Sequence, residues 1–219
     1  MTLFCFGQKD HLEPAKDIFK NDSSEYYVNC NKLLSNGFSQ KPDVRYTCMP
    51  SFSGEYAFSV EKVNGKNYVL SNRFSENYWY ALVENKKSSL KVITNKVEIT
   101  NELYLKIEEL FGLFIEQTKE KERIFETLPD GTVVEMLETI NDGERYIFSI
   151  TDKNGNIKTG TTHSPNSRDR PMLDRFVKIC DSLCLLENKN KESQTKILEE
   201  IKQLINGLKT RYTALSTCF

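Results

Sequence analysis

The sequence predicts an α+β fold, with antiparallel β-meanders and helices packed on one face of the sheet. Two separate stretches alternate apolar and polar residues and are divided by turn signals such as Asn64-Gly65 and Asn154-Gly155. Each stretch is followed by apolar residues at helical spacing. The chain of 219 residues is 38% hydrophobic and 28% charged, a balance typical of globular proteins. Strands and helices that are segregated along the chain favour α+β over an alternating α/β fold.

The first part of the chain is predicted to be helical with breaks. Within residues 12–36, Cys30 and Leu34 lie one helical turn apart. Pro14 suits a first helical turn, where its missing N–H costs nothing. Asn36-Gly37 is typical of a helix C-terminus, because glycine accepts the left-handed backbone that often ends a helix.

Residues 44–99 are predicted to form a meander of about five strands. The predicted strands cover residues 44–49, 55–63, 66–73, 78–83 and 90–99. Asn64-Gly65 is the strongest hairpin signal among them, because both central residues of that tight turn need positive φ. Tyr78-Trp79-Tyr80 adds amphipathic rings, which can serve the core on one strand face and a contact surface on the other.

A long helix and a second meander follow. Thr100 suits the cap of a helix that buries Leu103 and Ile107 on one face and is predicted to reach about residue 126. The sequence then predicts three strands, over residues 132–140, 144–151 and 156–162.

Two further helices complete the chain. Pro171 occupies a predicted first helical position, and Phe176 and Cys180 belong to the buried stripe of this helix. In the last helix, the apolar spacing from Ile197 onward continues through Gly207, so the helix is predicted to continue too.

The start of the chain predicts export. Residues 1–8 are apolar, and Cys5-x-Gly7 places small residues where signal peptides are cleaved, so the segment reads as the remnant of a signal peptide. We therefore expect a periplasmic or secreted protein. A periplasmic location would mean that the protein is bacterial. Residues 9–219 would then form a single domain, with a division into two subdomains near residue 128 as the alternative. A cytoplasmic protein that begins with an edge strand is the other interpretation.

Composition excludes two classes of partner. No apolar run approaches the roughly 20 residues of a transmembrane helix, so we expect no membrane span. The 30 basic and 31 acidic residues nearly cancel and form no long basic block, so we expect no nucleic-acid partner. The remaining expectation is a protein partner or a small anionic ligand.

The six cysteines include one closely spaced pair. Cys180 and Cys184 are four residues apart on a predicted helix, where Cβ atoms lie about 5–6 Å apart. A disulfide needs about 3.5–4.5 Å between them, so the two should not bond to each other. We expect buried core thiols, and the alternative is a disulfide with Cys30 or Cys48 in an oxidising compartment.

Catalytic and metal-binding patterns are poorly represented. His163 is the main candidate for a general base, but a strand would point its neighbour Ser164 to the opposite face. The sequence contains one cysteine pair, Cys180 and Cys184, but no second pair of zinc ligands, no complete calcium loop and no glycine-rich phosphate loop. We therefore predict no metal site and no cofactor.

One weak anion site can be proposed from the sequence. Ser164, Ser167, Arg168 and Arg170 lie just before the helix predicted to start at Pro171. Free backbone N–H groups at a helix start favour an anion such as a carboxylate, sulfate or phosphate. The simpler interpretation is that Ser167 or Asp169 caps this helix and that the arginines are solvated.

Three hypotheses for function follow from these patterns. The first is an exported, non-catalytic domain that binds a protein or another ligand. The second is a cytoplasmic inhibitor or immunity-type interaction protein. The third is a small hydrolase that uses His163 or carboxylates scattered along the chain.

Overall fold

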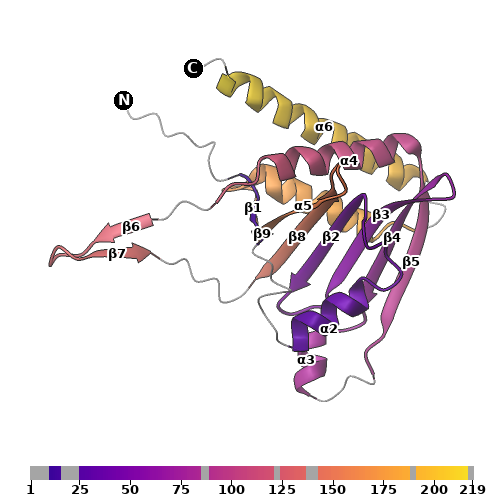
Figure 1. Cartoon of the computed structure of the whole chain (residues 1–219), viewed down its shortest axis with the longest axis horizontal. Helices are drawn as coiled ribbons and strands as arrows, with labels where there is room; N and C mark the ends of the chain where they lie inside the picture. The colour runs from indigo at the N-terminus through magenta and orange to yellow at the C-terminus, as the bar shows by residue number, and fades with distance from the viewer. Residues whose placement is uncertain are drawn as a thin grey trace.

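The computed structural model describes residues 10–15, 25–84, 89–120, 124–136, 143–187 and 191–216. It contains a large antiparallel sheet with helices packed against it and a separate hairpin that projects away from it (Figure 1). This arrangement confirms the predicted α+β class. The elements are, in chain order, β1 (Glu13–Pro14), α2 (Glu25–Leu34), β2 (Val44–Pro50), β3 (Tyr56–Val63), β4 (Lys66–Phe74), α3 (Tyr78–Val83), β5 (Val92–Ile99), α4 (Asn101–Glu116), β6 (Ile124–Thr127), β7 (Val133–Met136), β8 (Glu144–Thr151), β9 (Ile157–His163), α5 (Pro171–Cys184) and α6 (Lys191–Ser216).

The large sheet joins the two strand-rich parts of the sequence. Its strand order is β1-β9-β8-β2-β3-β4-β5. The central strand β2 pairs with β3 on one side and β8 on the other, so Tyr46 lies between Phe58 and Phe148. The predicted tight turn between β3 and β4 is confirmed, with φ of 50° at Asn64 and 78° at Gly65.

The main core lies between the sheet and helices α4 and α5, with α6 packed against both helices. Its centre is a cluster of fully buried aromatic rings (0% exposed). The ring of Phe176 lies 4.2 Å from Phe114, 4.5 Å from Phe148 and 4.8 Å from Phe111, measured between centroids. These rings come from α4, α5 and β8, so the core ties both helices to the sheet centre.

A smaller core lies on the opposite face of the sheet. There α2 packs Cys30 and Leu34 against Met49 of β2 and Phe74 of β4. Met49 and the main-core residue Cys48 are adjacent in β2 and therefore point to opposite faces. The sheet is thus covered by α4 and α5 on one face and partly covered by α2 and α3 on the other (Figure 1).

The strand predicted over residues 78–83 is wrong, because this segment forms helix α3. The side-chain oxygen of Asn77 accepts a hydrogen bond from the backbone N–H of Tyr80 and so caps the helix start. Tyr78 and Ala81 are the buried residues of α3. Their spacing of three is helical, which shows that the apparent alternation of this aromatic run is misleading.

The helix predicted to reach residue 126 ends earlier, at Glu116. Beyond its end the chain turns back, and the backbone N–H of Lys119 donates to the carbonyl oxygen of Leu12 at 2.9 Å. The charged residues that follow offer no further buried face to extend the helix. The next element among the described residues is β6.

The strand predicted over residues 132–140 also differs from the structure. Its described part is β7, which pairs with β6 in the projecting hairpin. β7 does not extend the meander of β8 and β9, because both edges of β8 are already occupied, by β9 and β2. Residues 137–142 lie outside the described part of the chain. The turn of this hairpin contains Leu128, the position of the alternative subdomain boundary.

The prediction for the start of the chain is partly wrong. Pro14 belongs to β1, where it lies opposite Gly160 of β9, and not to a helical turn. A helix does form over Glu25–Leu34 as α2. Residues 1–8, the predicted remnant of a signal peptide, lie outside the described residues.

The C-terminal helices agree with the sequence. α5 begins at Pro171, and α6 continues through Gly207. Among the described residues, no helix combines the length and the apolar character that crossing a membrane requires.

Candidate functional site

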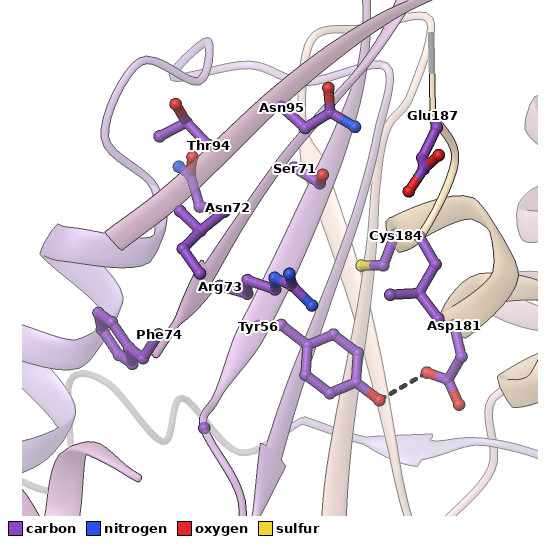
Figure 2. Close-up of a pocket in the computed structure, with 13 residues that line it drawn as sticks. Tyr56, Ser71, Asn72, Arg73, Phe74, Thr94, Asn95, Asp181, Cys184 and Glu187 are labelled. Atoms are coloured by element: carbon purple, nitrogen blue, oxygen red, sulfur yellow. Dashed lines mark hydrogen bonds between the residues drawn. The ribbon is translucent and has the colours of Figure 1, made fainter. Parts of the chain in front are cut away.

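A pocket of about 730 Å³ opens between the C-terminal part of α5 and strands β3, β4 and β5. Figure 2 shows that most of the labelled side chains around it are polar. The lining residues are Gly54, Tyr56, Ser71, Asn72, Arg73, Phe74, Ile93, Thr94, Asn95, Asp181, Cys184, Leu185 and Glu187.

The sheet wall of this pocket follows from the strand register. On the face covered by α4 and α5, a buried row is formed by Val60, Val69 and Val97. Two residues further along β4 the chain places Ser71, and two beyond that Arg73. Since residues at this spacing share one face, the wall changes from apolar to polar along the strands.

The helix wall is formed where α5 ends. The helix stops at Cys184, and the chain then turns across the sheet, held by a hydrogen bond of 2.6 Å from Asn95 Nδ2 to the carbonyl oxygen of Leu186. The helix layer therefore ends above the polar part of the sheet and leaves that part partly uncovered.

Two hydrogen bonds fix the orientation of Asp181 in the pocket. Its Oδ1 accepts hydrogen bonds from the hydroxyls of Tyr46 and Tyr56, each at 2.7 Å. Figure 2 shows the bond to Tyr56. Burial raises the pKa of Asp181, and the two hydroxyl bonds oppose part of this shift. Burial likewise raises the pKa of both tyrosines, so they remain donors.

Arg73 supplies a positive charge to the same pocket. Its guanidinium group points between Tyr56 and Cys184 in Figure 2. Arg73 is exposed, and it forms no hydrogen bond or ion pair with any residue that the structure describes. The group is therefore free to bind an anion from solution.

The thiol of Cys184 lines the pocket but is a poor nucleophile. Burial raises its pKa well above the ordinary value, so the thiolate is suppressed. Cys30, Cys48, Cys180 and Cys184 are all free thiols, and the first three are buried. Cys180 and Cys184 are not bonded to each other, as their spacing on one helix predicts. Neither of them is bonded to Cys30 or Cys48.

The anion site predicted from the sequence lies elsewhere, before α5. Ser164 Oγ accepts a hydrogen bond from the backbone N–H of Glu144 at 2.8 Å, and Arg170 donates to the hydroxyl of Thr162. The backbone N–H of Arg168 donates to Asn166 Oδ1 at 3.0 Å. Ser167 lies in the same exposed turn.

A carboxylate of this chain already occupies the start of α5. The Asp10 side chain accepts hydrogen bonds from the backbone N–H groups of Met172 and Leu173, each at 3.0 Å. Asp10 also forms an ion pair with Arg211 of α6 at 3.0 Å. The helix cap expected from Ser167 or Asp169 is therefore supplied by a residue far away in sequence.

His163 is engaged by a neighbouring strand. Its Nε2 accepts a hydrogen bond from Arg145 Nε at 3.0 Å, which leaves this nitrogen unavailable as a base while the bond persists. His163 does not line the pocket described above. Within the described part of the chain, no group of three or more His, Cys, Asp or Glu residues is arranged to hold a metal ion.

Sequence motifs do not identify the pocket residues, because these residues form no local pattern. A signal was present in the alternation of β4, where Ser71 and Arg73 continue the inward-facing register of Val69. The strand period places these polar residues at positions that would face the core. They mark the place where the helix layer over the sheet ends.

Fold and site together define an α+β protein with a mixed-charge pocket at the end of its helix layer. Comparison with known proteins gives no family, since no family model, no curated protein and no solved structure matches the chain.

Proposed function

We propose that this protein is a non-catalytic binding domain and that its pocket holds a small ligand that carries an anionic group. The observation that carries the proposal is Arg73, whose guanidinium group lies in the pocket without a partner among the described residues. Arginine offers a planar set of donors that matches a carboxylate or phosphate. A cation at a concave site is more consistent with ligand binding than one on a flat surface.

The surrounding groups support binding more than catalysis. The Ser71 hydroxyl can add a neutral hydrogen bond beside Arg73. The pocket lining includes no histidine, and burial keeps the Cys184 thiol protonated. The volume of 730 Å³ lies within the range of about 300–1,000 Å³ found for small-molecule sites.

The test is a thermal-shift screen of small carboxylates and phosphates with the full chain. A ligand present at about 100 times its Kd should stabilise the fold by about 2.7 kcal/mol, or raise Tm by roughly 5–10 °C. Arg73→Gln should reduce this rise to about half or less, because a tenfold loss of affinity lowers the stabilisation to about 1.4 kcal/mol. The matched control is Arg168→Gln, which removes an exposed arginine of the other candidate site.

The two variants separate the two sites. A Tm rise that is undiminished in Arg73→Gln and reduced in Arg168→Gln would move the anion site to the start of α5. A rise that is undiminished in both variants, or no rise with any anion in the wild type, would overturn the proposal.

We also propose that the domain acts outside the cytoplasm, in the periplasm or as a secreted protein. The apolar residues 1–8 and the small residues of Cys5-x-Gly7 support this proposal. Fractionation of cells that produce the natural gene product should find it in the periplasm or medium. Recovery in the cytoplasm alone would favour the inhibitor or immunity-type alternative.

A further inference from the structure

We infer that the ligand of this pocket is zwitterionic, with an ammonium group near Asp181 and Glu187 and a carboxylate at Arg73. This inference rests on the proposed function and adds the chemical class of the ligand. Its basis is that the pocket has walls of opposite charge. The sheet wall presents Arg73, and the helix wall, formed by α5 and the residues that follow it, presents both acids (Figure 2).

The second carboxylate oxygen of Asp181, Oδ2, is available to a ligand. Both tyrosine hydroxyls donate to Oδ1, and no described residue donates a hydrogen bond to Oδ2. The hydroxyls fix the orientation of the carboxylate, so a cation would find it preorganised. Burial raises the pKa of Asp181 because its charge lacks full compensation, and a ligand cation would supply that compensation.

Glu187 extends the acidic wall toward solvent. It is exposed, it follows α5, and its carboxylate points toward the pocket in Figure 2. Like Arg73, it forms no hydrogen bond or ion pair with any other described residue. An acid and a base that line the same pocket without pairing can engage opposite ends of one ligand.

The end of α5 adds to the negative character of this wall. The carbonyl groups of a C-terminal helical turn carry partial negative charge and attract cations. No basic residue lies in the last turn of α5 to offset it. The position of the ammonium group is therefore assigned to the helix wall and that of the carboxylate to the sheet wall.

The ligand class that fits both walls is the α-amino acid or the short peptide with free termini. Both carry an ammonium and a carboxylate, and they differ in the distance between the two charges. The neutral side chain of Ser71 lies next to Arg73 on the sheet wall. A hydroxyl there suits the polar backbone of such a ligand.

The experiment uses matched ligands with the intact protein. Calorimetric titration compares alanine and the dipeptide Ala-Ala with their N-acetylated and C-amidated forms. We expect each modification to weaken binding by about tenfold or more, since each removes one charge-assisted contact. Whether alanine or Ala-Ala binds more tightly identifies the spacing of charges that the pocket accepts.

Protein variants assign each charge to its wall. Arg73→Gln should remove the penalty for C-amidation and keep the penalty for N-acetylation. Glu187→Gln and Asp181→Asn should each reduce the penalty for N-acetylation. Glu187→Gln alters an exposed side chain and should spare the fold. Glu116→Gln, on the exposed end of α4, is the control and should change neither.

The outcomes separate this inference from the proposed function. If N-acetylated ligands bind as tightly as free ones, and Arg73→Gln still weakens binding of both, the zwitterion is overturned while the anion pocket stands. If the wild type and Arg73→Gln bind the whole series equally, the proposed function is overturned as well.

Discussion

Asp10 shows how one buried carboxylate can connect distant parts of the chain. Its side chain is only 4% exposed, yet it contacts the start of α5 and the Arg211 side chain of α6. The buried charge is compensated by two backbone N–H groups and a guanidinium group, the arrangement that makes a buried acid tolerable. The segment that carries Asp10 is thereby held against two helices.

Replacing Asp10 should therefore cost more stability than replacing Asp169, the acid that the sequence favours as the cap. Asp10→Ala removes both backbone partners and leaves Arg211 unpaired, so we expect a loss of about 1–3 kcal/mol. Asp169→Ala, at an exposed turn, should cost less than about 0.5 kcal/mol. Urea denaturation measures both. Equal losses would contradict the assignment of the cap to Asp10.

Glu55 is a second buried acid, and it organises the corner between α2 and α3. It is 0% exposed. Its carboxylate accepts hydrogen bonds from the Tyr26 hydroxyl at 2.7 Å and from the backbone N–H of Tyr78 at 2.8 Å. Burial nevertheless raises the pKa of Glu55, because the two bonds only partly replace water.

The raised pKa of Glu55 predicts the sign of a pH effect. The folded state binds the proton more tightly than the unfolded state, so ionisation of this group opposes folding. The stabilisation that comes from the protonated Glu55 side chain is fully present below the pKa of this group in the unfolded state. It is lost as pH rises through the pKa of the group in the folded state. We expect the free energy of unfolding of the wild type to fall relative to Glu55→Gln between pH 4 and pH 7, starting from about the ordinary pKa of glutamate.

Denaturation of both proteins across that range measures the difference, in which the titration of all other groups cancels. A wild type that gains stability over Glu55→Gln with rising pH would show that the carboxylate is stabilised in the fold.

At the scale of elements, Gly160 marks a close contact between β9 and its neighbours. A Cβ atom at this position would lie 2.8 Å from Leu12 Cδ1 and 3.1 Å from Thr118 Oγ1. The segment before β1, the strand β9 and the chain just after α4 therefore meet at a point that has no room for a side chain.

A pair of glycine substitutions tests this packing. Gly160→Ala should destabilise the fold by about 1–3 kcal/mol, because Leu12 and Thr118 must move. Gly112→Ala is the matched control, since nothing lies within 4 Å of the added Cβ atom in the middle of α4. It should stabilise the fold by about 0.5–1 kcal/mol. A neutral Gly160→Ala would show that the elements do not pack this closely.

The sequence predicts elements well where local pattern and burial agree. The hairpin around Asn64-Gly65 and the start of α5 at Pro171 are examples, since turn chemistry and apolar period indicate the same result. The sequence does not predict α3, because a run of six residues fits both the strand period and the helix period. The helix forms because Asn77 caps its start. β7 is missed because its partner depends on β2 pairing with β8, which is a long-range event.

The candidate site could be predicted less well than the fold. Arg73 is separated in sequence from Asp181 and Glu187, and only the packing of α5 on the sheet brings them into one pocket. The site proposed from local sequence, around Arg168, rests on a helix start whose free N–H groups are taken by Asp10. Local motifs describe what a segment can bind, whereas tertiary contacts decide which groups remain free.

At the scale of the whole molecule, the two faces of the sheet carry cores of different size. The main core includes α4, α5 and α6, whereas the core under α2 is confined to a few side chains of the opposite face. Free energies of local opening rise with the apolar surface that an element buries. We therefore expect α2 to open without unfolding the rest of the molecule.

Hydrogen exchange followed by mass spectrometry should show this hierarchy. Amides of α2 should exchange faster than those of β2, β3 and β8 in native conditions, because β2 lies at the centre of the sheet. Leu34→Ala, in the small core, should accelerate exchange in α2 and leave the central strands nearly unchanged. Leu103→Ala, in the main core, should accelerate exchange throughout. Both leucines are almost fully buried, at 1% and 0% exposure, so a difference between the variants reflects which core each belongs to. If Leu34→Ala accelerates exchange in the central strands as much as in α2, the two faces unfold as one cooperative unit.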